Sequence, residues 1–338
     1  MQNHKPLVAL IGAGTIGTAL GNILAENSEF PILLHSIEEK VVDEITRVHL
    51  NSKYFPGVHL HQNLFATTRD EELEKPEIIF LAIPSVILMS YLQKIRSHLP
   101  ASTVLVNLAK GFGAGNKTIV ECIKEEFSNP VCTMKGPSFA SEIMNHLPTG
   151  FTLGYQTTNQ ETEIPAPISS IPKLFKNTPI YLDYSSDIKG VEILSILKNI
   201  YAVAIGIVDA QFTSPNLRFL ILTKAFREMR KALLFFGGKQ DTLFNYCGFG
   251  DFNLTALNDL SRNRTLGLLI GKGFFTEHVS HELVLEGKTA TQVFYNEISG
   301  RVNVPETFPI IAELYKIFNT KYDISQFVKN ILDFSESE

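Results

Sequence analysis

The chain has 338 residues, of which 44% are hydrophobic and 19% are charged, and its formal net charge at pH 7 is −5. This length leaves room for about two domains with substantial cores, and the acidic balance argues against a general nucleic-acid-binding surface. Cys122, Cys132 and Cys247 follow neither a disulfide framework nor C-x-x-C spacing, so we expect a reducing, cytoplasmic setting.

The first predicted elements are a buried strand at 7–11 and a helix at 18–25, with the sequence G-A-G-T-I-G at 12–17 between them. In a G-x-G-x-x-G turn, the first glycine permits the tight turn and the second lets a pyrophosphate approach the backbone. The third glycine lets the helix pack closely on the strand, so the helix N-terminus faces the phosphates. We interpret this junction as a dinucleotide site rather than as a tight turn without a ligand.

Strands and helices continue to alternate through the first half of the chain. Further strands are expected at 32–35, 78–83, 103–107, 131–134, 151–154 and 179–183. Helices are expected at 37–46, 86–97 and 117–127, the last with Asn116 as its N-cap. This alternation predicts a parallel, doubly wound α/β sheet of the Rossmann type over residues 1–186.

From about residue 187 the pattern becomes mostly helical, and we expect a second, all-α domain over residues 187–338. Its predicted helices and turns are 188–207, 217–236, 242–244, 261–270, 290–298, 309–315 and 324–332. The apolar run at 78–92 contains Pro84 and is shorter than a membrane span, so no integral membrane association is expected.

Three clusters in the second half carry candidate chemistry. Lys198 interrupts an apolar helical run, where it would either be buried for proton exchange or extend to the surface. Asp251 ends a G-F-G turn, where it would orient that lysine, bind a hydroxyl or cap the next segment. The sequence S-R-N-R at 261–264 stands at a predicted helix start, which suits a phosphate but is also typical of a solvated basic turn.

Two loops of the first half belong to the same argument. Lys110 and the sequence G-P-S at 136–138 each follow a predicted strand. Ligands of open parallel sheets bind at the carboxyl ends of the strands, so these are candidate ligand-binding loops, although either could be an ordinary connection. No metal site is expected at two histidine pairs that lack supporting cysteines or carboxylates, His59 with His61 and His278 with His281.

In this order, these segments resemble the bacterial form of NAD(P)-dependent glycerol-3-phosphate dehydrogenase over nearly the whole chain. The resemblance rests on residues 12–19, 84–85, 110–111, 136–140, 197–199, 206–209, 248–251 with Thr255, 261–264, 286–287 and 289–290. It implies a cytoplasmic homodimer that interconverts dihydroxyacetone phosphate and sn-glycerol 3-phosphate with NAD or NADP. It also implies that the product glycerol 3-phosphate serves phospholipid synthesis.

The resemblance assigns roles residue by residue. The implied catalytic residues are Lys198, as the acid/base group, with Lys110, Asp251 and Thr255. The implied substrate-binding residues are Lys110, Gly136, Ser138, Lys198, Asp251, Ser261, Arg262 and Asn263. The implied cofactor-binding residues are Gly12, Gly14, Thr15, Ile16, Gly17, Ser36, Lys110, Ala140, Arg262, Val284 and Glu286.

Two positions that bear on the cofactor depart from the family pattern. Ile16 stands where a bulky aromatic residue is usual, and Ser36 stands where an arginine often follows the second strand. That arginine would meet the 2′-phosphate of NADP. With Ser36 in its place and Glu38 and Glu39 beyond it, the sequence favours hydrogen bonds to the ribose hydroxyls of NAD.

Two other functions remain open on the sequence alone. One is a related β-hydroxyacid-type dehydrogenase, because Arg262 would clasp a carboxylate as well as a phosphate. The other is a non-catalytic dinucleotide sensor, which would fit the altered Ile16 and Ser36. The complete set of Lys110, Lys198, Asp251 and Arg262 argues against a sensor, because a sensor need not retain groups for proton transfer.

Overall fold

The computed structural model describes residues 7–157, 163–274 and 286–333. The chain forms two compact units, Met1–Glu192 and Ile193–Glu338, and each is considered by itself. The domain boundary expected between residues 186 and 187 stays a prediction.

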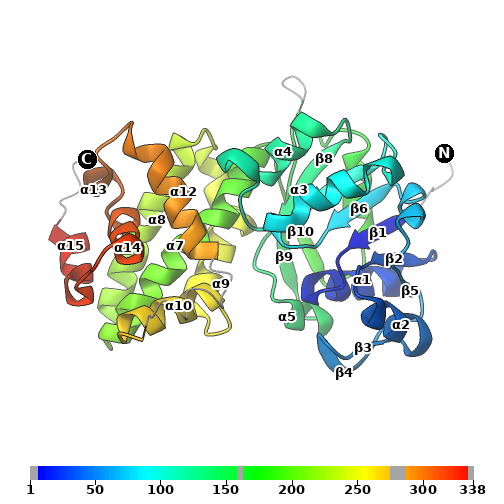
Figure 1. Ribbon diagram of the computed structural model, residues 1–338, viewed down its shortest axis with the longest axis horizontal. Helices are drawn as coiled ribbons and strands as arrows, with labels where there is room; N and C mark the ends of the chain where they lie inside the picture. The colour runs from blue at the N-terminus through cyan, green and yellow to red at the C-terminus, as the bar shows by residue number, and fades with distance from the viewer. Residues whose placement is uncertain (1–6, 158–162, 275–285, 334–338) are drawn as a thin grey trace. The chain divides into compact units, whose positions relative to one another are not determined.

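A single eight-stranded sheet organises the first unit. Its strands are β1 (Val8–Ile11), β2 (Ile32–His35), β5 (Leu64–Thr67), β6 (Ile78–Leu81), β7 (Val104–Asn107), β8 (Val131–Lys135), β9 (Thr149–Gly154) and β10 (Ile180–Ser185). They lie in the order β10-β9-β8-β7-β6-β1-β2-β5 (Figure 1). The strands from β8 to β5 are parallel, which confirms the predicted fold class. The sheet departs from parallel pairing at one edge, where β9 pairs antiparallel with β8 and parallel with β10.

Helices cover both faces of this sheet. The α-helices are α1 (Thr15–Asn27), α2 (Glu39–Val48), α3 (Ser85–Lys94), α4 (Ile119–Glu126), α5 (Ala140–Met144) and α6 (Ile171–Leu174). Short 3-10 helices are η1 (Asp70–Glu74), η2 (Arg96–His98), η3 (Ala114–Asn116) and η4 (Ile168–Ser170). Apolar residues of α1, α2, α5 and α6 pack on one face, and those of α3 and α4 pack on the other.

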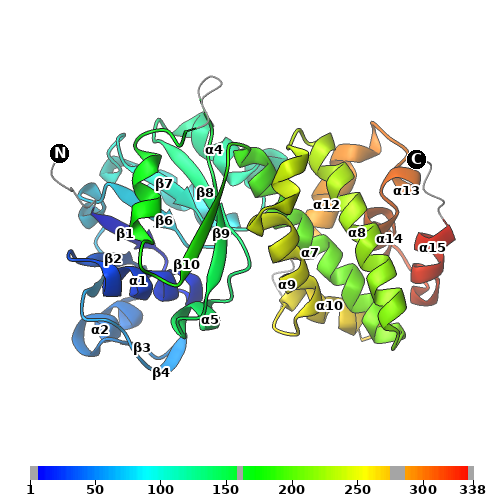
Figure 2. The same cartoon turned by 180° about the vertical axis from the view of Figure 1, so that it is seen from behind.

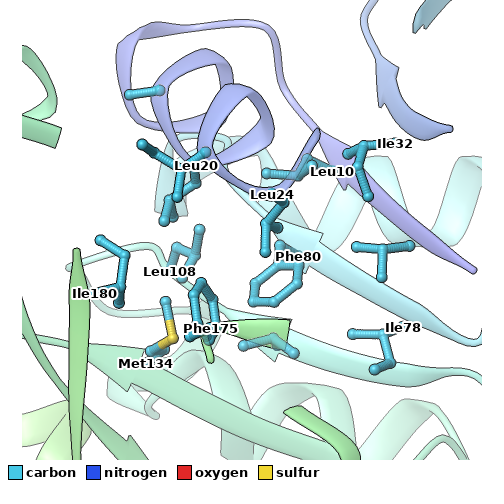
Figure 3. Close-up of a cluster of buried hydrophobic side chains, with 14 of the residues drawn as sticks. Leu10, Leu20, Leu24, Ile32, Ile78, Phe80, Leu108, Met134, Phe175 and Ile180 are labelled. Atoms are coloured by element: carbon cyan, nitrogen blue, oxygen red, sulfur yellow. The ribbon is translucent and has the colours of Figure 1, made fainter. Parts of the chain in front are cut away.

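The strands alternate between two cores because successive side chains point to opposite faces. Leu10 and Phe80 face α1, where Leu20 and Leu24 cover them (Figure 3). Ile11 and its neighbours on β6 and β7 face α3 and α4 instead. Burial on both faces explains why these strands read as continuous apolar runs in the sequence.

The start of α4 differs from the prediction. Thr118 is its N-cap and forms a capping box, with Oγ1 accepting the backbone N–H of Glu121 at 3.2 Å. The carboxylate of Glu121 accepts the backbone N–H of Thr118 in return, at 2.8 Å. Asn116, the predicted cap, ends η3 with φ at 59°. The T-x-x-E spacing was the sequence signal for the true cap.

The prediction also missed β5 and a small antiparallel hairpin. The hairpin consists of β3 (Leu50–Asn51) and β4 (Phe55–His59), which follow α2. Its second strand begins F-P-G, and both proline and glycine disfavour a strand reading. The hairpin lies beside the glycine turn, as the contacts described below show.

The second unit consists of helices and connections throughout its described residues. Its α-helices are α7 (Ile188–Gln211), α8 (Pro215–Phe235), α9 (Asp251–Leu257), α10 (Arg262–Gly271), α12 (Glu286–Ser299), α13 (Val304–Thr307), α14 (Pro309–Asn319) and α15 (Phe327–Asp333). Shorter turns are the 3-10 helices η5 (Gln240–Phe244) and η7 (Ile324–Gln326) and the single π-helical turn η6 (Tyr246–Gly250). The first turn of α7 belongs to the first unit.

Helix α7 is the core of the helical unit, with other helices around it (Figure 2). It is long and apolar enough to span a membrane, but the span is completely buried inside the protein, so it is a core helix. Glycines let α10 approach it closely. A Cβ on Gly206 would lie 2.3 Å from the carbonyl oxygen of Arg264, and a Cβ on Gly267 would lie 2.1 Å from that of Val203. This crossing fixes the first turn of α10 against α7.

Candidate functional site

The glycine turn joins β1 to α1 with the geometry that a dinucleotide needs. Gly12 has φ at 111°, and a Cβ there would lie 2.5 Å from the carbonyl oxygen of Ala82. A Cβ on Gly17 would lie 1.9 Å from the carbonyl oxygen of Gly12. A Cβ on Gly14 would instead face open space, beside an α1 N-terminus that no described side chain caps. Space at the second glycine and uncapped helix amides both suit a pyrophosphate.

The two candidate loops of the first unit meet at the carboxyl ends of β7 and β8. The Nζ of Lys110 donates to the carbonyl oxygen of Gly136 at 3.1 Å and lies 3.4 Å from Oγ of Ser138. The Ser138 hydroxyl donates to the same carbonyl at 2.9 Å. A Cβ on Gly136 would lie 2.1 Å from the carbonyl oxygen of Gly150, so only glycine fits there. The structure therefore brings three predicted site residues together.

Beneath the Lys110 loop lies a buried ion pair that the sequence analysis missed. Lys135, the last residue of β8, is fully buried, and its Nζ lies 3.1 Å from a carboxylate oxygen of Glu192. It also donates to the carbonyl oxygens of Asn107 and Ala109. The Asn107 amide donates to both oxygens of Glu192, at 2.9 and 3.0 Å. These bonds fix the backbone immediately before Lys110. Opposite charges in two apolar segments were the available signal.

In the second unit, Lys198 is buried with a carboxylate partner. It is 5% exposed, and its Nζ donates to Oδ1 of Asp251 at 2.6 Å and to Oγ1 of Thr255 at 3.0 Å. The Thr255 hydroxyl donates its proton to the carbonyl oxygen of Asp251 at 2.6 Å, which turns a lone pair toward the ammonium. Asp251 and Thr255 lie one turn apart on α9, which the π turn η6 precedes. Lys198 thus does not extend to the surface, and Asp251 pairs with it.

The first turn of α10 lies against the first turn of α12. Ser261 caps α10 through its hydroxyl. Asn263 is buried, and its Oδ1 accepts the backbone N–H of Gly287 at 3.0 Å. Glu286, beside that glycine, accepts a hydrogen bond from the side-chain amide of Asn199 at 3.2 Å. These contacts place Asn263 and Glu286 near Asn199, the residue that follows Lys198 on α7.

The two arginines of this segment differ in their surroundings. Arg264 is buried, forms an ion pair with Asp209 of α7, and lies 3.1 Å from Asp259. It therefore fastens α10 to α7. The Arg262 side chain is 71% exposed, and its guanidinium lies 3.7 Å from the carboxylate of Glu286. Of the two guanidiniums, only that of Arg262 is accessible enough to receive a phosphate.

A positive charge that the sequence analysis did not foresee, that of Lys53, lies near the end of β2. Ser36 is buried, and its hydroxyl accepts the backbone N–H of Glu38 at 3.2 Å. The Glu38 carboxylate forms an ion pair with Lys53 and accepts the hydroxyl of Tyr54 at 2.9 Å. The hydrogen bond from Lys53 is the main cause that lowers the pKa of Glu38. Glu39 stays exposed on the first turn of α2.

The remaining predicted residues are distributed as follows. Thr15 and Ile16 lie on the first turn of α1, and Ala140 is the first residue of α5. Val284 lies outside the described residues, as do His278 and His281. Within the described ranges, no group of three or more histidine, cysteine, aspartate and glutamate side chains could hold a metal ion.

Two family models match the chain, one to each half. The model described as the N-terminus of NAD-dependent glycerol-3-phosphate dehydrogenase matches residues 7–161, and the model of its C-terminus matches residues 187–329. A glycerol-3-phosphate dehydrogenase [NAD(P)+] from Methanothermobacter thermautotrophicus is 41% identical over 271 residues, which cover 79% of this chain and 80% of that protein. One from Clostridium botulinum is 32% identical and covers 94% of each chain.

The chain belongs to the glycerol-3-phosphate dehydrogenase family. The crystal structure of glycerol-3-phosphate dehydrogenase from Coxiella burnetii agrees in fold, with a TM-score of 0.85 and 27% identity over 97% of this chain and 99% of that one. These matches confirm the predicted family, the α/β domain followed by a helical domain, and NAD(P)-dependent dehydrogenase activity. The roles assigned to individual residues stay predictions.

Proposed function

We propose that this member of the glycerol-3-phosphate dehydrogenase family interconverts dihydroxyacetone phosphate and sn-glycerol 3-phosphate through Lys198. The observation that carries this proposal is the buried contact of the Lys198 ammonium with Asp251 and Thr255. A charged lysine beneath the surface of an enzyme is costly unless it is paired. The pair leaves the lysine charged and oriented, which is what a proton donor requires.

Cofactor binding is proposed at the glycine turn and at further residues of both units. The open space at Gly14 and the uncapped N-terminus of α1 fit the pyrophosphate of NAD(P). The bound dinucleotide supplies the hydride, and the protein supplies orientation and electrostatics. The other proposed contacts are Gly12, Thr15, Ile16, Gly17, Ser36, Lys110, Ala140, Arg262, Val284 and Glu286.

Proton transfer is the task of the second unit. In the reducing direction, Lys198 donates a hydrogen bond to the ketone oxygen at carbon 2 and then transfers a proton to it as negative charge develops. Asp251 holds the ammonium in register through its 2.6 Å hydrogen bond. Thr255 supplies a second acceptor at 3.0 Å, which further restricts the orientation of the ammonium. In the oxidising direction, the neutral amine takes the hydroxyl proton.

The proposed substrate-binding residues form one group in the second unit and another in the first. Arg262 and the amides at the start of α10 are proposed to bind the phosphate, with Ser261 at the cap. Asn263 has its oxygen held by a backbone N–H, and its amide N–H groups, which have no hydrogen-bond partner among the described residues, are proposed to bind the ligand. In the first unit, the proposed contacts are Lys110, Gly136 and Ser138.

The test is oxidation of NADH and NADPH by the purified protein in the presence of dihydroxyacetone phosphate, with a panel of 2-keto acids in parallel. We expect turnover with the phosphate and little with the keto acids. Turnover with a keto acid alone would favour the hydroxyacid-type dehydrogenase. Binding of NADH without turnover of any substrate would favour the dinucleotide sensor.

Three properties of the protein are proposed together with this activity. We infer that it acts in the cytoplasm, supplies glycerol 3-phosphate for phospholipid synthesis, and forms a homodimer. Family membership supports each of them. Sedimentation equilibrium of the purified chain tests the homodimer, because a monomer mass at micromolar concentration would contradict it.

A further inference from the structure

The β3–β4 hairpin is fastened beside the glycine turn by a buried side chain. Asn51 is fully buried, and its Nδ2 donates to the carbonyl oxygen of Ala13 at 3.0 Å and to Oγ1 of Thr18 at 2.9 Å. The next residue, Ser52, donates its backbone N–H to the carboxylate of Glu44 on α2 at 3.0 Å. The tip of the hairpin is therefore held against both the nucleotide-binding turn and the helix that follows β2.

This tip carries a cation to the end of β2. Lys53 forms an ion pair with Glu38, and the hydroxyl of Tyr54 donates to the other carboxylate oxygen at 2.9 Å. The Lys53 ammonium also lies 5.0 Å from the centre of the Tyr54 ring. Glu38 is linked back to Ser36 by its backbone N–H. Lys53 and Glu38 are 54% and 35% exposed, so both charges remain accessible to a ligand.

In dinucleotide-binding sheets the adenosine ribose lies near the end of the second strand. An acidic residue there binds the 2′-hydroxyl of NAD, whereas a cation accommodates the 2′-phosphate of NADP. This chain has both charges at that end of β2, paired with each other. The cation comes from the hairpin rather than from Ser36, the position directly after the strand.

We propose that the Glu38–Lys53 pair reads the 2′ position of the cofactor ribose. With NADP(H), Lys53 turns from Glu38 to the 2′-phosphate. With NAD(H), Lys53 stays on Glu38, whose carboxylate accepts the hydrogen bond of the 2′-hydroxyl. Exposed ion pairs are weak, so breaking the Glu38–Lys53 pair to bind a phosphate costs little free energy. The enzyme therefore accepts both cofactors. The proposal rests on the proposed function of the glycine turn as the NAD(P) site.

The test compares kcat/KM for NADPH and NADH in two charge-neutralising variants. Lys53→Gln is expected to lower the NADPH:NADH ratio by about tenfold or more, because it removes a charge-assisted contact to phosphate and leaves Glu38 repelling it. Glu38→Gln is expected to raise the ratio, because it frees Lys53 and removes that repulsion. Both changes should appear in KM for the cofactor more than in kcat, since neither residue touches the reacting atoms.

A matched control is Lys75→Gln, which neutralises another exposed lysine of the same unit. Lys75 pairs with Glu72 at 2.6 Å and precedes β6, at the opposite end of the strands from the glycine turn. The NADPH:NADH ratio of kcat/KM in Lys75→Gln should equal that of the unmodified protein. A ratio that moves equally in Lys53→Gln and Lys75→Gln would reduce the effect to overall charge and overturn the proposal.

Binding of two fragments gives a readout that does not depend on catalysis. Titration calorimetry should show that Lys53→Gln lowers the affinity for 2′,5′-ADP, which carries the 2′-phosphate. The affinity for 5′-AMP, which lacks it, should stay unchanged. Equal affinity of the variant and the unmodified protein for 2′,5′-ADP would overturn the proposed role of Lys53 in binding the 2′-phosphate. If the unmodified protein binds both fragments yet reduces no dihydroxyacetone phosphate, the proposed function fails. The fragment affinities of Lys53→Gln still decide whether Lys53 binds the 2′-phosphate.

Discussion

Replacement of Asp251 by asparagine isolates the electrostatic part of the lysine site. The substitution keeps the shape and an acceptor oxygen at 2.6 Å from Lys198 but removes the negative charge. Asp251 is 1% exposed and Lys198 is 5% exposed, so little water is available to replace the lost partner. Removing one partner of a buried pair typically destabilises a protein by about 3–5 kcal/mol.

The protonation of the lysine limits the penalty that an unpaired ammonium can impose. An ordinary lysine with a pKa of about 10.4 is neutralised at pH 7 at a cost of about 1.36 kcal/mol per pH unit, or about 4.6 kcal/mol in all. In the Asp251→Asn variant, the penalty for an unpaired ammonium does not exceed about this amount, because Lys198 can release its proton instead. A neutral Lys198 cannot act as the acid, so we expect reduction at pH 7 to fall by about 10²–10⁴-fold.

The sign of the pH dependence follows from the same argument. Lowering the pH restores the ammonium of Lys198 in the variant, so its residual rate of reduction should rise as pH falls. The assays are oxidation of NADH with dihydroxyacetone phosphate across pH and urea unfolding at pH 7. Asp241→Asn is the control, because Asp241 is exposed in η5 of the same unit and such surface changes stay within about 0.5 kcal/mol. An Asp251→Asn protein with unmodified turnover and stability would refute the reasoning.

Three further predictions use other groups. Lys198→Ala should lower kcat about 10²–10⁴-fold while NADH binding, followed by fluorescence, stays nearly unchanged; near-normal turnover would remove its assigned role. Arg262→Ala should weaken use of dihydroxyacetone phosphate more than of dihydroxyacetone, near the lower end of about 1.5–3 kcal/mol because the side chain is exposed; equal losses would assign it to the cofactor. Burial raises the pKa of Glu228 to about 8 although it accepts the N–H groups of Ile310 and Ile311. The folded state therefore holds that proton longer than the unfolded state, stability falls as pH rises from about 4.5 to about 8, and Glu228→Gln should flatten this fall in urea titrations.

The sequence was sufficient for most of the sheet because parallel strands are buried on both faces and appear as short apolar runs. It was not sufficient for the direction of β9 and β10. Strand direction depends on where the chain re-enters the sheet, and the segment after β8 contains only the short α5 before β9 begins. The boundary of α4 was predictable from Thr118 and Glu121, whose spacing is a local signal.

The lysine site was only partly predictable. An apolar helix interrupted by Lys198 indicates a special lysine, yet its partner Asp251 lies 53 residues further along the chain. Nothing local in the sequence decides whether that carboxylate caps a helix or reaches a lysine. Only the resemblance to the glycerol-3-phosphate dehydrogenase family, which rests on several motifs in a fixed order, connected Asp251 with Lys198. The pair of Lys135 and Glu192 had no such motif, and only the packing of β8 on the first turn of α7 brings the two charges within 3.1 Å.

The end of β2 shows why cofactor preference is harder to read than cofactor binding. The glycine turn acts through backbone geometry, and its consequences are confined to a few neighbouring residues. The charge that faces the ribose is required only to lie near one place, and any segment that reaches this place can supply it. Here Asn51 fastens a hairpin to the glycine turn, and the hairpin brings Lys53 to Glu38. A search directly after the second strand finds Ser36 and two glutamates and misses Lys53, which pairs with Glu38. The contacts of Asn51 provide the missing information, because they show which distant segment lies against the glycine turn.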